Sequence, residues 1–396
     1  MRAIVLSGGG SKGAYQIGVW KALRRLKIKY DIVTGTSVGA LNGALMVTKS
    51  YHKAYSLWKN IGFRDVFDQD IKSDYFTPEG KKAIAKKYAK AIFLDHGMSP
   101  NNLEKTVEAK LNYKKLKKSK IKFSFITYNL SDLKPKVINI EKESVDKIKH
   151  YLIASSSCFP AFQKKKIEGK DYIDGGYYDN FPVNLAIDLG ADEIVAIDLK
   201  EIGFKRPVKS KKVKIIYISP NNHLGSFLVF DKRLSRKNIK YGYNDTMKVY
   251  GKLEGKKYTF KKNHLEKNYI KYSRKFNILI QSFLSKKGLI TNLIKRITLK
   301  QEYNLRDFQK IIEFLGTIYE IDDTKIYSYR RFNRLLLKAQ RKYKLNRIND
   351  SRNIINNILN NNTKKTNKSW ELAFSKEVLG ALYLKNLKNS CIFQRR

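Results

Sequence analysis

The sequence predicts an α/β fold in the first half of the chain, with a mostly parallel sheet covered by helices, followed by a mainly helical C-terminal region. Three observations support this prediction. Short β-rich runs alternate with amphipathic helical runs over residues 1–200. Two glycine-rich turns each join a strand-like run to a helical run. After Pro220 the chain becomes rich in Lys, Tyr and Asn and contains few turn residues.

The spacing of apolar residues predicts the individual elements. Helical spacing is found in five segments, residues 13–28, 38–47, 144–154, 303–319 and 370–387. Strand-like runs occupy six segments, residues 3–7, 31–34, 121–129, 137–140, 193–199 and 213–218. The Asn- and Lys-rich stretch 349–368 is expected to be a mobile connection. Residues 58–100 give no clear pattern.

Composition indicates a folded protein with a strongly basic second half. The chain has 396 residues, is 42% hydrophobic and carries a formal net charge of +46, so it is long enough to bury more than one core. Residues 1–200 contain 35 basic and 21 acidic side chains, and residues 201–396 contain 46 and 14. Such a surface attracts nucleic acid or an anionic bilayer. Compositional drift towards Lys and Asn explains the charge equally well.

Cysteine use and hydropathy indicate a reducing compartment and no membrane span. Cys158 and Cys391 are too few for a secreted disulfide framework, and no Cys/His cluster has zinc spacing. The first apolar run is too short for a signal peptide. Residues 32–48 form an uncharged stretch, but it contains three glycines and several polar residues, so we expect no transmembrane helix.

The first chemical motif is the run Gly8-Gly9-Gly10-Ser11-Lys12-Gly13, between a predicted strand and a predicted helix. Backbone N–H groups that converge at such a turn, together with the helix N-terminus, suit an anion. A dinucleotide site and a purely structural turn are both alternatives. The first lacks the acidic residue expected at the end of the second strand. A phosphate-binding P-loop does not fit, because Lys12 precedes the last glycine.

The second motif is Gly35-Thr36-Ser37-Val38-Gly39, which follows the second predicted strand and opens a predicted helix. This is the context of a nucleophile elbow, where a sharp turn exposes a serine hydroxyl and glycines allow the strand and helix to approach each other. Ser37 is therefore a candidate nucleophile.

A serine nucleophile needs a base, and the third motif offers one. Asp174 precedes Gly175 and Gly176 at the end of a short strand-like run, although Asp-Gly is also a common turn dipeptide. No histidine lies in a recognisable motif; the five are His52, His96, His150, His223 and His264. The last two follow Asp174, as the order of a Ser-Asp-His triad requires.

Taken together, these residues resemble the patatin-like phospholipases. That family has a G-G-G-x-[KR]-G loop, a G-x-S-x-G elbow and a D-G-[GA] motif in this order, which match residues 8–13, 35–39 and 174–176. Residues 154–160 resemble the family's small-residue segment that ends in proline, and residues 178–183 resemble its Asn-x-Pro turn before a helix. The resemblance covers residues 1–200, is loose over 224–260 and is absent from the last 136 residues.

The resemblance implies a three-layer α/β/α catalytic domain with a Ser-Asp dyad. Ser37 would be the nucleophile and Asp174 the base, without a histidine, a metal or another cofactor. Backbone N–H groups of Gly8, Gly9 and Gly10, with Val38 as an alternative donor, would bind the oxyanion. Lys12 would either hold the glycine loop or face solvent. Ser155 departs from the family, since many members have alanine there.

The resemblance also implies a function, a serine lipid acyl hydrolase of the phospholipase A or lysophospholipase type that works without calcium. Phospholipid or another acyl-ester lipid would be the substrate, and the protein would be cytoplasmic and peripheral to an anionic membrane surface. Residues 1–210 would form the catalytic domain, 211–260 an extension, and 261–396 a basic helical region of unknown role.

Two other functions stay open on the sequence alone. One is a soluble carboxylesterase with a triad that uses His223 or His264. The other is a nucleic-acid-binding protein on a degenerate hydrolase scaffold, with tyrosines between basic residues at 240–243 and 327–331. We do not expect nucleic acid as a partner, because tyrosines at helical spacing usually belong to a core.

Overall fold

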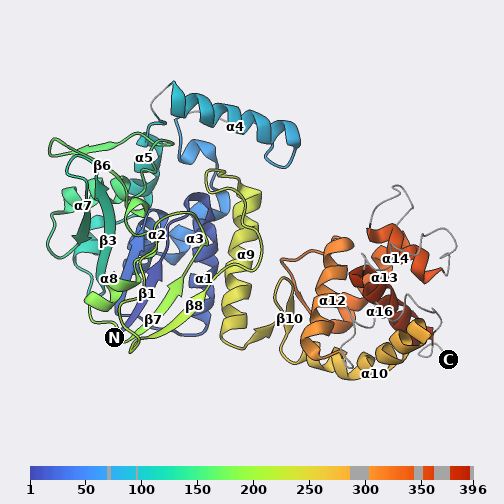
Figure 1. Cartoon of the computed structure of the whole chain (residues 1–396). Helices are drawn as coiled ribbons and strands as arrows, with labels where there is room; N and C mark the ends of the chain where they lie inside the picture. Colours follow the sequence, from blue (N-terminus) through green and yellow to red (C-terminus); the bar gives the residue numbers. More distant parts are fainter. Residues whose placement is uncertain (69–72, 95–96, 286–302, 343–350, 361–374, 393–396) are drawn as a thin grey trace. The chain divides into compact units, whose positions relative to one another are not determined.

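The computed structural model describes residues 1–68, 73–94, 97–285, 303–342, 351–360 and 375–392. The chain forms two compact units, Met1–Val249 and Tyr250–Arg396 (Figure 1). The first unit thus continues past residue 210, and the predicted extension 211–260 is divided between the two units.

An eight-stranded sheet forms the centre of the first unit. Its order is β5-β6-β3-β2-β1-β7-β8, and β4 pairs with β3. The strands are β1 (Arg2–Leu6), β2 (Ile32–Thr36), β3 (Lys122–Asn129), β4 (Lys134–Asn139), β5 (Lys165–Ile167), β6 (Lys170–Asp174), β7 (Glu193–Ile197) and β8 (Lys214–Ile218). The five strands β3, β2, β1, β7 and β8 are parallel to one another, which confirms the predicted mostly parallel sheet. β4 and β6 pair with β3 in the antiparallel direction, as β5 does with β6.

Helices cover both faces of this sheet. On one face α8 (Val183–Asp188) packs against alternate residues of the central strands, such as Ala3, Val5 and Ile194. On the other face α2 (Val38–Val47) lies close to Val33 and Phe123. The remaining α-helices among the described residues of this unit are α1 (Gly13–Arg25), α3 (Tyr51–Asn60), α4 (Pro78–Phe93), α5 (Asn101–Lys110), α6 (Tyr113–Lys117), α7 (Val145–Ser155) and α9 (Lys232–Val249). This is the predicted three-layer arrangement.

The second unit is mainly helical, as predicted, and has its own aromatic core. Its described helices are α10 (His264–Ser285), α12 (Leu305–Ile318), α13 (Tyr329–Lys342), α14 (Ser351–Leu359) and α16 (Ser375–Ile392). Phe276, Phe308, Phe332 and Tyr383 are fully buried at its centre. A small sheet of β9 (Leu253–Glu254), β10 (Thr259–Lys261) and β11 (Ile326–Tyr327) was not expected from the sequence.

Three sequence-based expectations can be compared with this unit and with α9. The stretch 349–368 was expected to be a mobile connection, but residues 351–359 form α14, and residues 349–350 and 361–368 lie outside the described residues. The start of the predicted helix 370–387 also lies outside them.

Tyr241, Tyr327 and Tyr329 are buried, so these tyrosines belong to cores rather than to exposed stacking surfaces. No helix among the described residues is long and apolar enough to cross a membrane.

Candidate active site

The register of β3 brings Ser37 and Asp174 to the same place. One edge of β3 pairs with β4 from Ser124 to Asn129. The opposite edge pairs with β2 as far as Ile126, which lies opposite Thr36, and then with β6 from Thr127, which lies opposite Asp174. The ends of β2 and β6 therefore meet head to head at successive residues of β3, and the predicted nucleophile and base both stand at that junction.

Ser37 occupies a strained turn between β2 and α2. Its φ of 58° and ψ of −132° are unusual for a residue with a side chain, and such a conformation costs about 1–3 kcal/mol. The turn closes because Ala40 N–H donates a hydrogen bond to the Ser37 carbonyl oxygen at 2.8 Å. The geometry of the turn is that of a nucleophile elbow.

Glycines make this turn sterically feasible. A Cβ atom on Gly39 would lie 2.3 Å from the carbonyl oxygen of Leu6, at the end of β1. A Cβ atom on Gly35 would lie 2.4 Å from the carbonyl oxygen of Gly39. Because both contacts are to backbone, no side-chain rearrangement relieves them. The two glycines of the motif let α2 start directly above the strand ends, and Thr36 and Val38 complete the turn on either side of Ser37.

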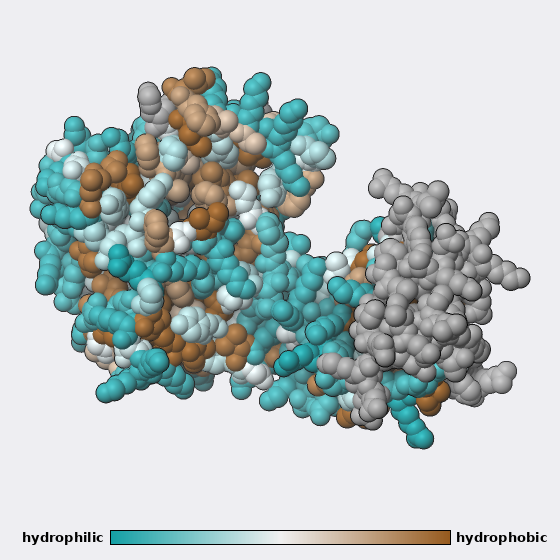
Figure 2. All heavy atoms as spheres, in the orientation of Figure 1, coloured by the Kyte–Doolittle hydropathy of each residue, from teal (hydrophilic) through white to brown (hydrophobic). Residues whose placement is uncertain are grey.

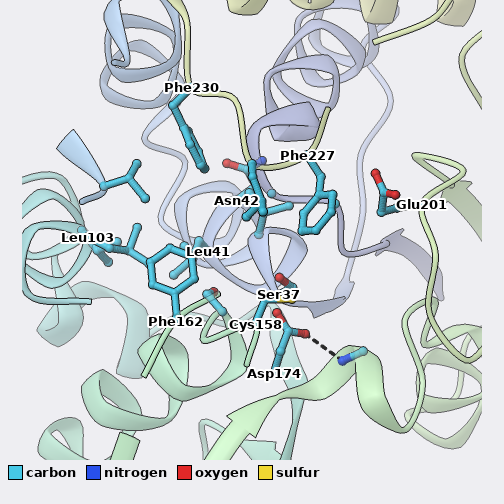
Figure 3. Close-up of a pocket in the computed structure, with 18 of the residues that line it drawn as sticks. Ser37, Leu41, Asn42, Leu103, Cys158, Phe162, Asp174, Glu201, Phe227 and Phe230 are labelled. Atoms are coloured by element: carbon cyan, nitrogen blue, oxygen red, sulfur yellow. Dashed lines mark hydrogen bonds between the residues drawn. The ribbon is translucent and has the colours of Figure 1, made fainter. Parts of the chain in front are cut away.

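Asp174 ends β6 and is almost completely buried, with 5% of its surface exposed. Burial raises the pKa of its carboxyl from 3.8 to about 7, against the hydrogen bonds from the Ser37 hydroxyl and the Gly176 N–H, which lower it. The Gly176 N–H donates to Oδ1 of Asp174 at 2.8 Å (Figure 3). Gly175 fits closely above β3, since a Cβ there would lie 2.2 Å from the Ile126 carbonyl oxygen. A carboxyl with this pKa can both accept and return a proton near neutral pH.

The glycine-rich loop follows β1, next to β2. Gly9 and Gly10 line the same cavity as Ser37, whereas the Gly8 N–H donates to the carbonyl oxygen of Asn180 at 3.0 Å. Gly10 has a φ of +52°, and a Cβ on it would lie 2.2 Å from the Phe227 carbonyl oxygen, so only glycine fits there. Gly13 begins α1.

Lys12 forms an ion pair with Glu201, and both side chains are largely shielded from solvent. Two positions were predicted for Lys12, one facing solvent and one holding the glycine loop. In the structure Lys12 has the second of these positions. Glu201 lines the cavity and belongs to the segment between β7 and β8, so the pair ties that segment to the glycine loop.

A mostly apolar cavity of about 400 Å³ opens from Ser37 and lies in the size range of small-molecule sites. Its walls come from α2, α3, α5 and the segment before α9 (Figure 3), and the apolar residues include Leu41, Leu45, Leu57, Trp58, Ile61, Val66, Leu103, Val107, Leu111, Phe162, Phe227 and Phe230. Asn42 also lines it, but its amide is engaged by Gln16 and by Trp58 Nε1, each at 2.8 Å. The cavity is shaped for a hydrocarbon chain.

Cys158 also lines the cavity, close to Asp174. Burial, together with the negative charges of Asp174 and Glu201, raises the pKa of its thiol to about 12. The thiol is therefore protonated at neutral pH and is a poor nucleophile beside Ser37.

Ser155, the residue that departs from the family pattern, contacts the elbow directly. Its hydroxyl accepts a hydrogen bond from the Ser37 N–H at 3.0 Å and donates one to the Ile126 carbonyl oxygen at 2.7 Å. It thus links the nucleophile's backbone to the strand at the β2–β6 junction. Sequence inspection identified Ser155 as a departure from the family but did not indicate this link.

We expect Ser155→Ala to lower the free energy of unfolding by about 1–3 kcal/mol, because the buried Ser37 N–H loses its partner. Ser157→Ala is the matched control: its buried hydroxyl donates to the Ile153 carbonyl oxygen, which also accepts from the Ser156 N–H. Urea titration of both variants tests this. Equal losses of stability in the two variants would show that the hydrogen bond between Ser155 and the Ser37 N–H does not stabilise the fold more than the one made by Ser157.

The site contains residues that sequence inspection did not single out. Glu201, Phe227 and Phe230 come from segments without motifs, and apolar spacing does not distinguish a cavity wall from a core. Asn180 belongs to the predicted Asn-x-Pro turn, but its place in the cavity wall was not predicted. None of the cavity-lining residues in the described part of the chain is a histidine. His223 instead accepts a hydrogen bond from the Gly225 N–H, and His264 packs against Tyr329 in the second unit. A triad is not supported by this geometry.

The fold and site define an α/β protein with a serine on a strand-to-helix elbow and a buried carboxyl beside it. Residues 4–187 match the family model described as patatin-like phospholipase, and this part of the chain belongs to that family.

Curated relatives are fungal proteins named lysophospholipase NTE1. The protein from Aspergillus terreus is 30% identical over 209 residues, and that from Coccidioides immitis is 30% identical over 206 residues. In each case the match covers 52% of this chain but only 12% of the relative, so the similarity concerns one region of much longer proteins.

Two solved structures match over most of this chain. VipD from Legionella pneumophila has a TM-score of 0.36 and 16% identity, with 98% of this chain and 91% of that chain covered. The type III effector ExoU has a TM-score of 0.33 and 14% identity, with 96% and 76% covered. Both TM-scores are low, and the fold described above rests on its own strand order.

Proposed function

We propose that this protein is a serine lipid acyl hydrolase of the phospholipase A or lysophospholipase type, with Ser37 as nucleophile and Asp174 as base. The observation that carries the proposal is the meeting of a strained serine and a buried carboxyl of raised pKa at the mouth of an apolar cavity. Family membership of residues 4–187 and the named activity of the fungal relatives support it.

In the proposed reaction, the Ser37 hydroxyl attacks the ester carbonyl carbon while its proton passes to Asp174. The tetrahedral oxyanion is bound by the N–H groups of Gly9 and Gly10, since the Gly8 N–H already has a partner. The intermediate collapses, and the alcohol leaves with the proton from Asp174. Water then attacks the acyl-enzyme as Asp174 accepts a proton from it, and the fatty acid is released when that proton returns to Ser37.

The substrate is proposed to be a lipid with a single acyl chain in the cavity. The cavity's apolar walls would bury the hydrocarbon chain at about 0.8 kcal/mol per methylene group, and its volume of about 400 Å³ is at the lower end of ligand sites. The ester would then stand at Ser37 and the head group outside. No step of this reaction requires calcium.

A lipid phosphonofluoridate probe and a hydrolysis assay test the proposal. We expect the probe to modify Ser37, located by peptide mass spectrometry, and the wild type to release fatty acid from lysophosphatidylcholine in the presence of a chelator. Heat-denatured protein is the control and should not be labelled. Modification of a different residue would refute Ser37 as the nucleophile. Labelling of Ser37 with no release from monoacyl lipids, diacyl phospholipids or acylglycerols would refute the proposed substrate class.

A further inference from the structure

Residues 198–212, which make up almost all of the segment between β7 and β8, border the cavity and are called the docking loop. It contains six basic and two acidic residues, and every residue from Ile202 to Lys209 is exposed. Three residues of this loop that follow Glu201, namely Ile202, Gly203 and Phe204, line the cavity mouth. The loop is therefore part of the site and part of the outer surface at once.

The backbone of the docking loop is held in place beside the catalytic motifs. Phe204 N–H donates to the Gly176 carbonyl oxygen at 3.2 Å, and the Phe204 carbonyl oxygen accepts from Asn180 N–H at 2.6 Å. The ion pair of Glu201 with Lys12 adds an attachment to the glycine loop. Both backbone groups of Phe204 are thus hydrogen-bonded, to Gly176 and to Asn180. The loop could move Phe204 into the interior only by breaking these bonds.

Two large apolar side chains nevertheless point away from the protein. Ile202 is 93% exposed and Phe204 is 68% exposed. Hydrophobic residues reach the surface of the first unit in several places (Figure 2), but these two combine high exposure with a position at the cavity mouth. Exposed apolar side chains on an anchored backbone favour a partner that offers hydrocarbon.

The charges around this apolar tip indicate the kind of partner. Lys205, Arg206 and Lys209 follow within a few residues and are exposed, although Lys205 is paired with Asp198 and Lys209 with Asp188. Lys211 and Lys212 extend the basic run and are exposed as well. An apolar tip with a basic flank is complementary to the hydrocarbon and the anionic head groups of a bilayer.

We propose that the docking loop inserts Ile202 and Phe204 into an anionic phospholipid bilayer and thereby seats the cavity mouth against the membrane surface. This inference rests on the proposed function and specifies how the site meets its substrate. A lipid could then move its acyl chain from the bilayer into the cavity without crossing water, with Lys211 and Lys212 among the anionic head groups.

Vesicle binding by the Ser37→Ala protein tests the inference without lipid breakdown. We expect it to bind phosphatidylcholine vesicles that contain phosphatidylglycerol. Ile202→Ser with Phe204→Ser in the same background should weaken binding by on the order of tenfold to a hundredfold, because two inserted side chains are lost. Lys211→Gln with Lys212→Gln should weaken binding by on the order of tenfold with phosphatidylglycerol and little without it. Leu133→Ser with Val137→Ser is the matched control, because both residues are exposed and neither lines the cavity.

Unchanged vesicle binding after loss of Ile202 and Phe204, or an equal loss in the Leu133 and Val137 control, would overturn the proposal. So would light scattering that showed the two residues to hold two copies of the chain together, with vesicle binding unaltered. These results are separate from the fate of the proposed function. The binding assay uses an inactive protein, whereas the hydrolase proposal is tested by labelling of Ser37 and by fatty-acid release from the wild type.

Discussion

Replacing Ser37 by alanine or by glycine is expected to abolish fatty-acid release, with a loss on the order of 10⁴-fold to 10⁶-fold in kcat/KM. Both changes remove the nucleophilic oxygen and the hydrogen bond that the hydroxyl donates to Asp174. They differ in the backbone. At a φ of 58° and a ψ of −132°, alanine keeps the strain of the elbow, whereas glycine adopts this conformation without a Cβ penalty.

The pair of variants therefore separates chemistry from strain. We expect Ser37→Gly to be more stable than Ser37→Ala by about 1 kcal/mol, after the entropy of glycine in the unfolded chain is set against the relieved strain. Urea unfolding followed by tryptophan fluorescence measures this, since Trp20 and Trp58 both lie in the first unit. Residual activity in either variant near the wild-type level would rule out Ser37 as the nucleophile, and equal stabilities would argue against a strained elbow.

The parts of the site that could be predicted from sequence are those fixed by local backbone geometry. The turn that carries Ser37 has no room for a Cβ atom at Gly35 or Gly39, so its motif is visible in the sequence. The helix after this turn was predicted to span Val38–Val47, which are the bounds of α2. Apolar periodicity also located most strands of the sheet to within a few residues, because buried parallel strands are continuous apolar runs.

The remaining parts depend on contacts between segments that are distant in sequence. The Gly8 N–H was predicted to be an oxyanion donor, but Asn180, which follows β6, accepts it. Ser155 was recognised only as a departure from the family, because its bonds to Ser37 and Ile126 depend on the register of β3. The helix at residues 351–359 was missed for another reason: its Asn-rich sequence has low helix propensity, and packing of Ile355 in the core of the second unit outweighs it.

Asp174→Asn is the second change with a large expected effect. An amide cannot accept the Ser37 proton, so we expect a loss of about 10⁴-fold in kcat/KM. In the wild type, the carboxyl must be ionised to act as a base. Because its pKa is raised to about 7, activity should rise with pH and reach half of its maximum near pH 7. A profile with its midpoint near pH 4 would contradict a buried, desolvated base.

The same raised pKa predicts that the dyad lowers the stability of the fold. Below about pH 4 the carboxyl is protonated in both the folded and the unfolded chain. Between about pH 4 and pH 7, Asp174 is ionised in the unfolded chain but still largely protonated in the folded protein, so the free energy of unfolding falls as the pH rises. Above about pH 7, Asp174 is ionised in both states, and the folded protein then bears the full cost of a buried charge. Raising a pKa from 3.8 to about 7 corresponds to roughly 4 kcal/mol.

We therefore expect Asp174→Asn to be more stable than the wild type at pH 8, by about 2–4 kcal/mol, and to lose this advantage as the pH falls towards 4. Glu141→Gln is the control, since Glu141 is exposed and its replacement should leave the pH dependence of unfolding unchanged. A variant that is inactive and also less stable than the wild type at pH 8 would mean that the ionised carboxyl is a structural partner. An inactive but stabilised variant would mean that the fold tolerates an unfavourable buried charge because the reaction uses it.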